Sequence, residues 1–229
     1  MDIFHFLGIA IEHKQGLRLL HLWGRRFIPS VIDQREIQEL CAECREHPFP
    51  CFMKLLAEIL DIEDASVLDL TFGIGEFYMF WKPKYLAAFD IVDWRKHGFK
   101  FVCEPDEFYE QPFEKAPTVL GDRKFDVVVF DPPYSTNPSS KSPAHEKPWL
   151  YHNRENLDAM LRIFPKIAKK YARKYVIVKI MGKCKYALIR NMHEDPTYEI
   201  VFRRVRYSVP AANVKILDVA TYVLIWKLT

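Results

Sequence analysis

The sequence has few of the features that mark secreted or membrane proteins. Its cysteines number only five in 229 residues, an odd and low count that indicates a reducing compartment. No apolar run approaches the roughly 20 residues that a membrane helix needs. No basic segment precedes the short apolar stretch at the start, so a signal peptide is not expected. With 49% hydrophobic and 28% charged residues, the chain is expected to be globular and cytoplasmic, without membrane contact, and to form a single domain over 1–229.

Acidic residues are missing from one long stretch. Residues 159–193 contain ten Lys or Arg and no Asp or Glu, although the net charge of the whole chain is only +3. A concentrated positive field attracts polyanions, and the phosphate backbone of a nucleic acid is the obvious candidate. The alternative is a solvated, lysine-rich helix face. We therefore expect a nucleic acid as the partner and make no prediction of oligomeric state.

Apolar runs alternate with helical patterns along most of the chain. Together they predict an α/β fold with a mainly parallel sheet, in which 1–46 is an N-terminal segment and 47–229 the core. The run FDVVVF at 125–130 is typical of a strand buried on both faces. The last two strands are expected to form an antiparallel edge pair. Strands are predicted at 66–72, 85–91, 99–104, 125–130, 175–181, 198–209 and 219–228, and helices at 32–47, 52–60 and 154–173.

Glycine is scarce, yet two of the eight glycines stand within three residues of each other. Gly73 and Gly75 follow the predicted strand VLDLTF and are expected to form the turn into the next helix. Without a Cβ, such a turn lets a ligand approach the backbone closely. Asp90 comes 21 residues after Asp69, a spacing that suits a carboxylate accepting hydrogen bonds from the ribose of an adenosine-type cofactor. The alternative is a tight turn that binds nothing.

A second motif follows the strand at 125–130 directly. It is Asp131-Pro132-Pro133-Tyr134, and its two prolines fix a rigid backbone that cannot continue the strand. The Asp131 carboxylate and the Pro132 carbonyl then become two preorganised acceptors, which suit an amino group carrying two hydrogens. Tyr134 offers a flat face on which a base can stack. The alternative is a strand terminator with a solvated aspartate.

With both motifs in this order, the sequence resembles the S-adenosylmethionine-dependent amino-methyltransferases that carry a D/N/S-P-P-Y/F/W motif. These include DNA adenine-N6 and cytosine-N4 methyltransferases. The resemblance covers roughly residues 47–134 and includes His47-Pro48-Phe49-Pro50-Cys51-Phe52 and VLDLTFGIG. It departs from the family at Leu70-Thr71, where Pro-Phe is usual, and at Glu76, where Ser or Thr is common. It implies a Rossmann-like methyltransferase fold.

The resemblance also implies a role for each motif. S-adenosylmethionine would lie over the Gly73–Gly75 turn with Asp90 on its ribose, while Asp69 would organise the turn or contact the methionine amino group. The residues implied for cofactor binding are Asp69, Thr71, Gly73, Gly75, Asp90, Phe49 and Phe52. Those implied for catalysis are Asp131, Pro132, Pro133 and Tyr134. Those expected to contact the substrate are Ser135, Trp149, Tyr151, Lys183, Lys185, Arg203, Arg204 and Arg206.

The family's Asp form favours adenine N6, so the predicted reaction is direct methylation of that amine in DNA, with a flipped base if the target is a duplex. The alternative is an RNA methyltransferase acting on guanine N2 or adenine N6. A third interpretation is an inactive nucleic-acid-binding or partner subunit that keeps the fold.

One group of residues is typical of a metal site. It includes the C-x-x-C spacing of many zinc sites at Cys41 and Cys44, with His47 and Cys51 nearby. However, Cys41 and Cys44 fall in a helical pattern, and no second pair of ligands follows at the spacing of a zinc finger. We therefore expect thiols here and no bound metal.

Overall fold

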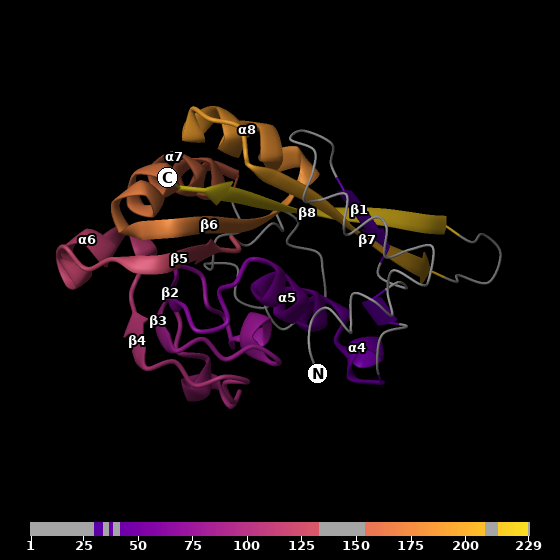
Figure 1. Ribbon diagram of the computed structural model, residues 1–229, viewed down its shortest axis with the longest axis horizontal. Helices are drawn as coiled ribbons and strands as arrows, with labels where there is room; N and C mark the ends of the chain where they lie inside the picture. Colours follow the sequence, from indigo (N-terminus) through magenta and orange to yellow (C-terminus); the bar gives the residue numbers. More distant parts are fainter. Residues whose placement is uncertain (1–29, 34–36, 39–41, 133–153, 209–214, 229) are drawn as a thin grey trace.

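A computed structural model describes residues 30–33, 37–38, 42–132, 154–208 and 215–228. One sheet contains eight strands, and Figure 1 shows it running through the centre of the molecule. The strands are β1 (Ser30–Asp33), β2 (Ser66–Asp69), β3 (Tyr85–Asp90), β4 (Glu107–Glu110), β5 (Phe125–Phe130), β6 (Ala172–Met181), β7 (Tyr198–Ser208) and β8 (Lys215–Lys227).

The strand order is β1-β7-β8-β6-β5-β2-β3-β4. The neighbours from β4 through to β6 are parallel, whereas β8 lies antiparallel to both β6 and β7. This arrangement confirms the predicted Rossmann-like α/β fold and the antiparallel pairing of the last two strands. That pair is not the outer edge of the sheet, however, because β1 adds a further parallel strand to β7.

Helices cover both faces of the sheet. Figure 1 shows α7 and α8 on one side of the long strands and α5 on the other. No helix in the described part of the chain is both long and apolar enough to cross a membrane. The helices are α4 (Ala42–Glu46), α5 (Pro48–Ile59), α6 (Ala116–Leu120), α7 (Arg154–Tyr171) and α8 (Gly182–Met192), with short 3₁₀ turns η2 (Glu76–Tyr78), η3 (Trp94–His97) and η4 (Phe113–Lys115).

Strand β5, near the centre of the sheet, shows why a strand covered on both faces needs a continuous apolar run. Val127 and Val129 of β5 belong to the core beneath α5, while Val128 and Phe130 belong to the core beneath α6, α7 and α8. Alternate residues of a strand point to opposite faces, so a strand covered on both faces must be apolar at nearly every position. The prediction for 125–130 is confirmed residue for residue.

The predicted strand at 99–104 is wrong. That segment is a loop in which the Val102 N–H donates to the Ile74 carbonyl at 2.8 Å, and the strand that pairs with β3 at the edge is β4 instead. Because β4 is an edge strand with glutamate at both ends, it lacks the apolar run that marks a buried strand. The loop contains the buried Phe101 and Cys103, whose apolarity reflects packing rather than strand structure.

Two further expectations differ from the structure, and one helix was not expected. The predicted helix at 32–47 begins too early, because Ile32 and Asp33 belong to β1. The Gly73–Gly75 turn leads only into the three-residue turn η2 and not into a helix. Helix α8 was not predicted at all. Pro48 does mark a boundary as expected, but it also begins α5, since a helix tolerates proline in its first turn.

Cys44 and Cys51 form a disulfide between α4 and α5, with their Cα atoms 5.4 Å apart. The prediction that these residues are thiols is therefore wrong. The reason is geometric: α5 starts two residues after α4 ends, and the junction between the two helices brings a cysteine of each within bonding distance.

Candidate active site

Aspartates stand at or just beyond the carboxyl ends of β2, β3 and β5. Strand β2 is paired with β3 on one side and with β5 on the other, in parallel register, so the chain switches direction across the sheet at β2. Open α/β sheets bind ligands at such switch points. Asp69 and Asp90 end their strands, and Asp131 directly follows Phe130, so the three side chains meet at this edge.

Asp69 is buried, with 3% of its surface exposed. One of its oxygens accepts from the Thr71 N–H at 2.8 Å and the other from the Tyr78 hydroxyl at 2.8 Å. Burial raises the pKa of Asp69 to about 7, although both hydrogen bonds oppose the shift; the nearby Asp131 and Asp90 add to the rise. Through these two hydrogen bonds, Asp69 stabilises the turn after β2.

The two glycines of the turn have different surroundings. Both have positive φ, +62° at Gly73 and +81° at Gly75. A Cβ on Gly75 would lie 2.6 Å from the Phe72 ring and 3.1 Å from the Cys103 carbonyl oxygen, so the protein's own packing requires glycine there. A Cβ on Gly73 would meet nothing within 4 Å. The open side of the turn is therefore at Gly73, where a ligand can approach the backbone.

Asp90 is linked to the same turn. Its carboxylate accepts from the Gly73 N–H at 2.8 Å and from the Val92 N–H at 3.0 Å. Burial raises its pKa to about 6, against the effect of these hydrogen bonds. Each carboxylate oxygen has a second lone pair, so these bonds do not prevent Asp90 from accepting from a ribose hydroxyl.

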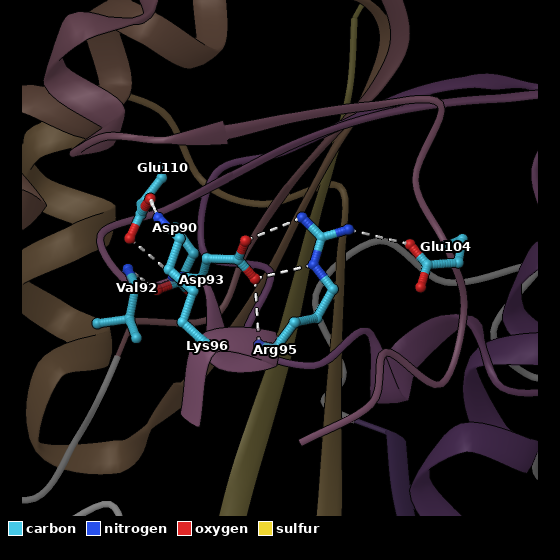
Figure 2. A network of polar contacts seen from close by, with 7 residues as sticks. All are labelled: Asp90, Val92, Asp93, Arg95, Lys96, Glu104 and Glu110. Atoms are coloured by element: carbon cyan, nitrogen blue, oxygen red, sulfur yellow. Dashed lines mark hydrogen bonds and ion pairs between the residues drawn. The ribbon is translucent and has the colours of Figure 1, made fainter. Parts of the chain in front are cut away.

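The segment after Asp90 is fixed by a polar network. Figure 2 shows the Arg95 guanidinium forming a fork with Asp93, at 2.9 and 3.0 Å, and reaching Glu104 at 3.5 Å. The hydrogen bonds from Arg95 lower the pKa of Asp93. Lys96 pairs with Glu110 at the end of β4. This network holds the chain beside Asp90 in place.

Asp131 is connected through its backbone to the turn after β2. Its N–H donates to the Thr71 Oγ1 at 2.6 Å. Its carboxylate oxygen Oδ2 accepts from the Lys179 ammonium at 2.7 Å. The same ammonium lies 4.6 Å from the centre of the Phe49 ring and 4.9 Å from that of Phe77. Aromatic faces and a carboxylate thus surround one cation beside the predicted catalytic aspartate.

Lys179 is the site residue that the sequence reasoning missed. It stands inside the apolar strand YVIVKIM, between Val178 and Ile180, which are fully buried. A lysine at such a position needs a partner. That irregularity was visible in the sequence, but the identity of the partner was not.

The predicted cofactor residues on α5 differ in exposure. Phe49 is half-buried at the site, and its ring lies 5.2 Å from the Phe77 ring. Phe52 is 2% exposed and belongs to the core behind Phe49, 5.7 Å away between ring centres. Phe49 is thus the member of the pair that lies beside the predicted catalytic residues.

Lys185, which was expected to contact the substrate, lies inside the fold. Lys185 is 8% exposed and donates to Glu199 of β7 at 2.7 Å, because α8 turns it toward the sheet. Pro133, Tyr134, Ser135, Trp149 and Tyr151 lie outside the described residues, as do the side chains of Lys183, Arg203, Arg204 and Arg206.

No family model and no curated protein matches the chain, but solved structures match its fold. Protein 1320 of Thermoplasma acidophilum is 14% identical, with a TM-score of 0.51 over 83% of this chain and 96% of that one. TrmN from Thermus thermophilus is 17% identical, with a TM-score of 0.46 over 78% of this chain and 49% of that one. A SAM-dependent methyltransferase from Neisseria gonorrhoeae is 14% identical, with a TM-score of 0.43 over 90% of this chain and 76% of that one. At 14% identity, the similarity to the Thermoplasma acidophilum protein shows the fold and nothing finer.

Proposed function

We propose that the protein is an S-adenosylmethionine-dependent methyltransferase that acts on the exocyclic amine of a nucleobase, with adenine N6 in DNA as the first candidate. One observation carries the proposal. The Gly73 turn and Asp131 lie at one switch point of the sheet and are joined directly, because the Thr71 hydroxyl at the turn accepts from the Asp131 N–H. A cofactor on the turn and an amine on Asp131 would therefore be held in a fixed relation.

The residues at the turn fit S-adenosylmethionine. The backbone at Gly73 is open where a Cβ would otherwise stand, and Asp90 lies within hydrogen-bond distance of the same glycine. Gly73 would receive the cofactor on its open side, Asp90 would accept from the ribose, and Phe49 would contact the cofactor. When bound, S-adenosylmethionine supplies a methyl group activated by a sulfonium.

The chain's own part in the reaction is to hold the acceptor amine. The lone pair of an aromatic amine is delocalised into its ring, so the amine is a poor nucleophile until its hydrogens are held. The Asp131 carboxylate and the Pro132 carbonyl would accept those two hydrogens and direct the lone pair toward the methyl group. Fixed geometry and preorganised acceptors are the two effects that lower the barrier in this proposal. Tyr134 would stack on the base.

A nucleic acid is the substrate class that the charge distribution supports. Residues 159–193 contain ten basic and no acidic residues. One described lysine of this stretch, Lys169, pairs with Glu194 at 3.4 Å. Exposed pairs of this kind contribute little energy and exchange readily for phosphate. The resemblance of Asp131-Pro132-Pro133-Tyr134 to the Asp form of the motif supports adenine.

The test is a methylation assay with S-adenosylmethionine carrying a labelled methyl group. The protein is offered unmethylated duplex DNA, single-stranded DNA and total RNA, and each is digested so that the labelled nucleoside can be identified by mass. Label on N6-methyladenine from DNA is the expected result. The Asp131→Ala variant should lose at least about 100-fold in rate while still binding the cofactor in calorimetry.

Asp122→Ala is the matched control, because Asp122 is a fully exposed aspartate whose distance to Lys170 is 3.9 Å. It should retain full activity. Label found only in RNA would move the substrate class to RNA. Cofactor binding without label on any nucleic acid would refute nucleobase methylation by this chain alone.

A further inference from the structure

Lys179 stands where a charged residue is costly. Its neighbours in β6, Val178 and Ile180, are fully buried in the core beneath α7 and α8, and Ile177 is buried in the opposite core beneath α5. Strand alternation places Lys179 on the same face as Ile177, beneath α5. A lysine adds nothing to packing there that an apolar residue would not supply, so its charge calls for another explanation.

The surroundings of Lys179 account for its charge. The side chain is 22% exposed, and its ammonium donates to Asp131 Oδ2 at 2.7 Å. The rings of Phe49 from α5 and Phe77 from η2 lie within 5 Å of the ammonium. Charge-assisted hydrogen bonds are the strongest and most directional of those available to a carboxylate. The Asp131 side chain is thereby held by Lys179, and its backbone by Thr71.

We infer that Lys179 is a positioning residue for methyl transfer: its ammonium orients the Asp131 carboxylate toward the acceptor amine. The inference rests on the proposed function, because it assigns Lys179 a role that acts through Asp131. Hydrogen bonds at its N–H and at Oδ2 hold Asp131, so its carboxylate keeps one orientation between turnovers. The aromatic rings in turn keep the ammonium in place, and they separate it from water on that side.

The register of the sheet explains why the pair forms. Phe130 of β5 lies opposite Val178 of β6 in parallel register. The next positions along the two strands are Asp131 and Lys179. The pair therefore stands at the carboxyl end of β5, where the acceptor would enter.

The experiment compares kinetic constants of variants on whichever nucleic acid the wild-type protein methylates. Lys179→Met keeps the length of the side chain and removes the charge, whereas Lys179→Arg keeps the charge and its donors. We expect Lys179→Met to lower kcat by about 10- to 100-fold, the range seen when a group that orients a functional ligand is lost. Lys179→Arg should stay within about fivefold of wild type. The KM for nucleic acid and the Kd for S-adenosylmethionine should be unchanged in both.

Lys174→Met is the matched control, because Lys174 lies on the same strand, is exposed and pairs with Asp126 away from the site. It should keep wild-type constants. Melting temperatures and the stoichiometry of cofactor binding establish that each variant is folded, and Lys179→Gln replaces the methionine variant if the latter does not fold. A purely structural role would lower the folded fraction and leave kcat per bound cofactor unchanged.

A double-mutant cycle decides whether Lys179 acts through Asp131. Rates of Asp131→Asn and of Asp131→Asn with Lys179→Met are measured under single-turnover conditions with excess enzyme. If Lys179 acts by orienting Asp131, adding Lys179→Met to Asp131→Asn should cost less than about threefold.

Multiplicative losses, an unchanged kcat in Lys179→Met, or a raised cofactor Kd with kcat intact would each overturn the assignment. These outcomes leave the proposed function standing. Absence of wild-type activity on every nucleic acid would instead refute the proposed function, and the role of Lys179 with it.

Discussion

At the scale of single residues, the aspartates at the carboxyl edge of the sheet differ in what holds them. Asp69 is buried and accepts hydrogen bonds from the Thr71 N–H and the Tyr78 hydroxyl, whereas Asp90 accepts from two backbone N–H groups. Asp131 is held by a lysine. Burial raises the pKa of Asp69 and of Asp90.

Asp69 should make the stability of the protein depend on pH. Its ordinary pKa of 3.8 is raised to about 7 in the folded state. The folded protein thus keeps a proton that the unfolded chain has released, and the free energy of unfolding falls as the pH rises between these values. A pKa raised from 3.8 to about 7 corresponds to about 4 kcal/mol. Asp90 acts in the same direction up to about pH 6.

The measurement is urea unfolding of wild type and Asp69→Asn across pH 4 to 8. The amide can keep both hydrogen bonds but does not titrate in this range. Asp69→Asn should therefore gain stability relative to wild type as the pH rises, with most of the difference developed by pH 7.5. Parallel curves for the two proteins would show that Asp69 does not take up a proton on folding.

The two glycines of the turn should respond differently to alanine. Gly75→Ala places a Cβ 2.6 Å from the Phe72 ring, so it should destabilise the fold by about 2–4 kcal/mol through overpacking and backbone strain. Gly73→Ala adds only backbone strain, about 1 kcal/mol, but its Cβ enters the space proposed for the cofactor. Calorimetry should show cofactor binding weakened about tenfold or more in Gly73→Ala. Equal binding by Gly73→Ala and wild type would place the cofactor elsewhere.

At the scale of elements, the ends of β2 and β5 behave as one unit, because Thr71 joins them. Thr71→Val removes the acceptor of the Asp131 N–H and should cost about 1–3 kcal/mol of stability. It should also lower the methylation rate, since Asp131 loses the hydrogen bond that holds its backbone. Thr71→Ser keeps the hydroxyl and should behave like wild type in urea unfolding and in the labelled-methyl assay. If Thr71→Val matches Thr71→Ser in both, the link has no functional weight.

Elements buried on both faces could be predicted from the sequence, whereas elements defined by their partners could not. The apolar run of β5 carries its own signal, and its bounds are as predicted. Strand β1 is only four residues long and exists because β7 pairs with it across the chain. Strand β4 is polar at both ends because it lies at an edge. Local patterns contain no record of such distant pairing.

The candidate site could be predicted only in part, because local patterns mark the strand ends but not which strands lie side by side. The positions of Asp69, Asp90 and Asp131 follow from strand ends, which the apolar runs mark. The Asp131–Lys179 pair depends on which strand lies next to β5, and the burial of Lys185 depends on a helix that the sequence pattern did not reveal. Counting charge in a window cannot separate a lysine that faces solvent from one that pairs with an acid inside the fold.

At the scale of the whole molecule, the basic residues of the segment 159–193 therefore do not form one uniform surface. Lys185→Met should destabilise the protein by about 3 kcal/mol, because it leaves Glu199 partly buried without its ion-pair partner. It should leave nucleic-acid affinity unchanged, along with the slope of log K against log salt concentration. Unfolding and binding titrations at several salt concentrations measure both.

Lys166→Met is the comparison, since Lys166 lies on α7 in the same window and is exposed. Its stability should change by no more than about 0.5 kcal/mol. A reduction of the salt slope by about one in Lys185→Met would mean that Lys185 contacts a phosphate.

The position of β1 has a consequence for the order in which the protein can be completed on the ribosome. Ser30 pairs with Ile200, so the first described strand finds its partner 170 residues later. Strands β2 to β6 are synthesised consecutively and pair among themselves in the parallel part of the sheet. They can assemble while the chain is still growing, since domains form from the N-terminal side as synthesis proceeds. Strand β1 can pair with β7 only after β7 has left the exit tunnel, so the first described strand is among the last to find its place in the sheet.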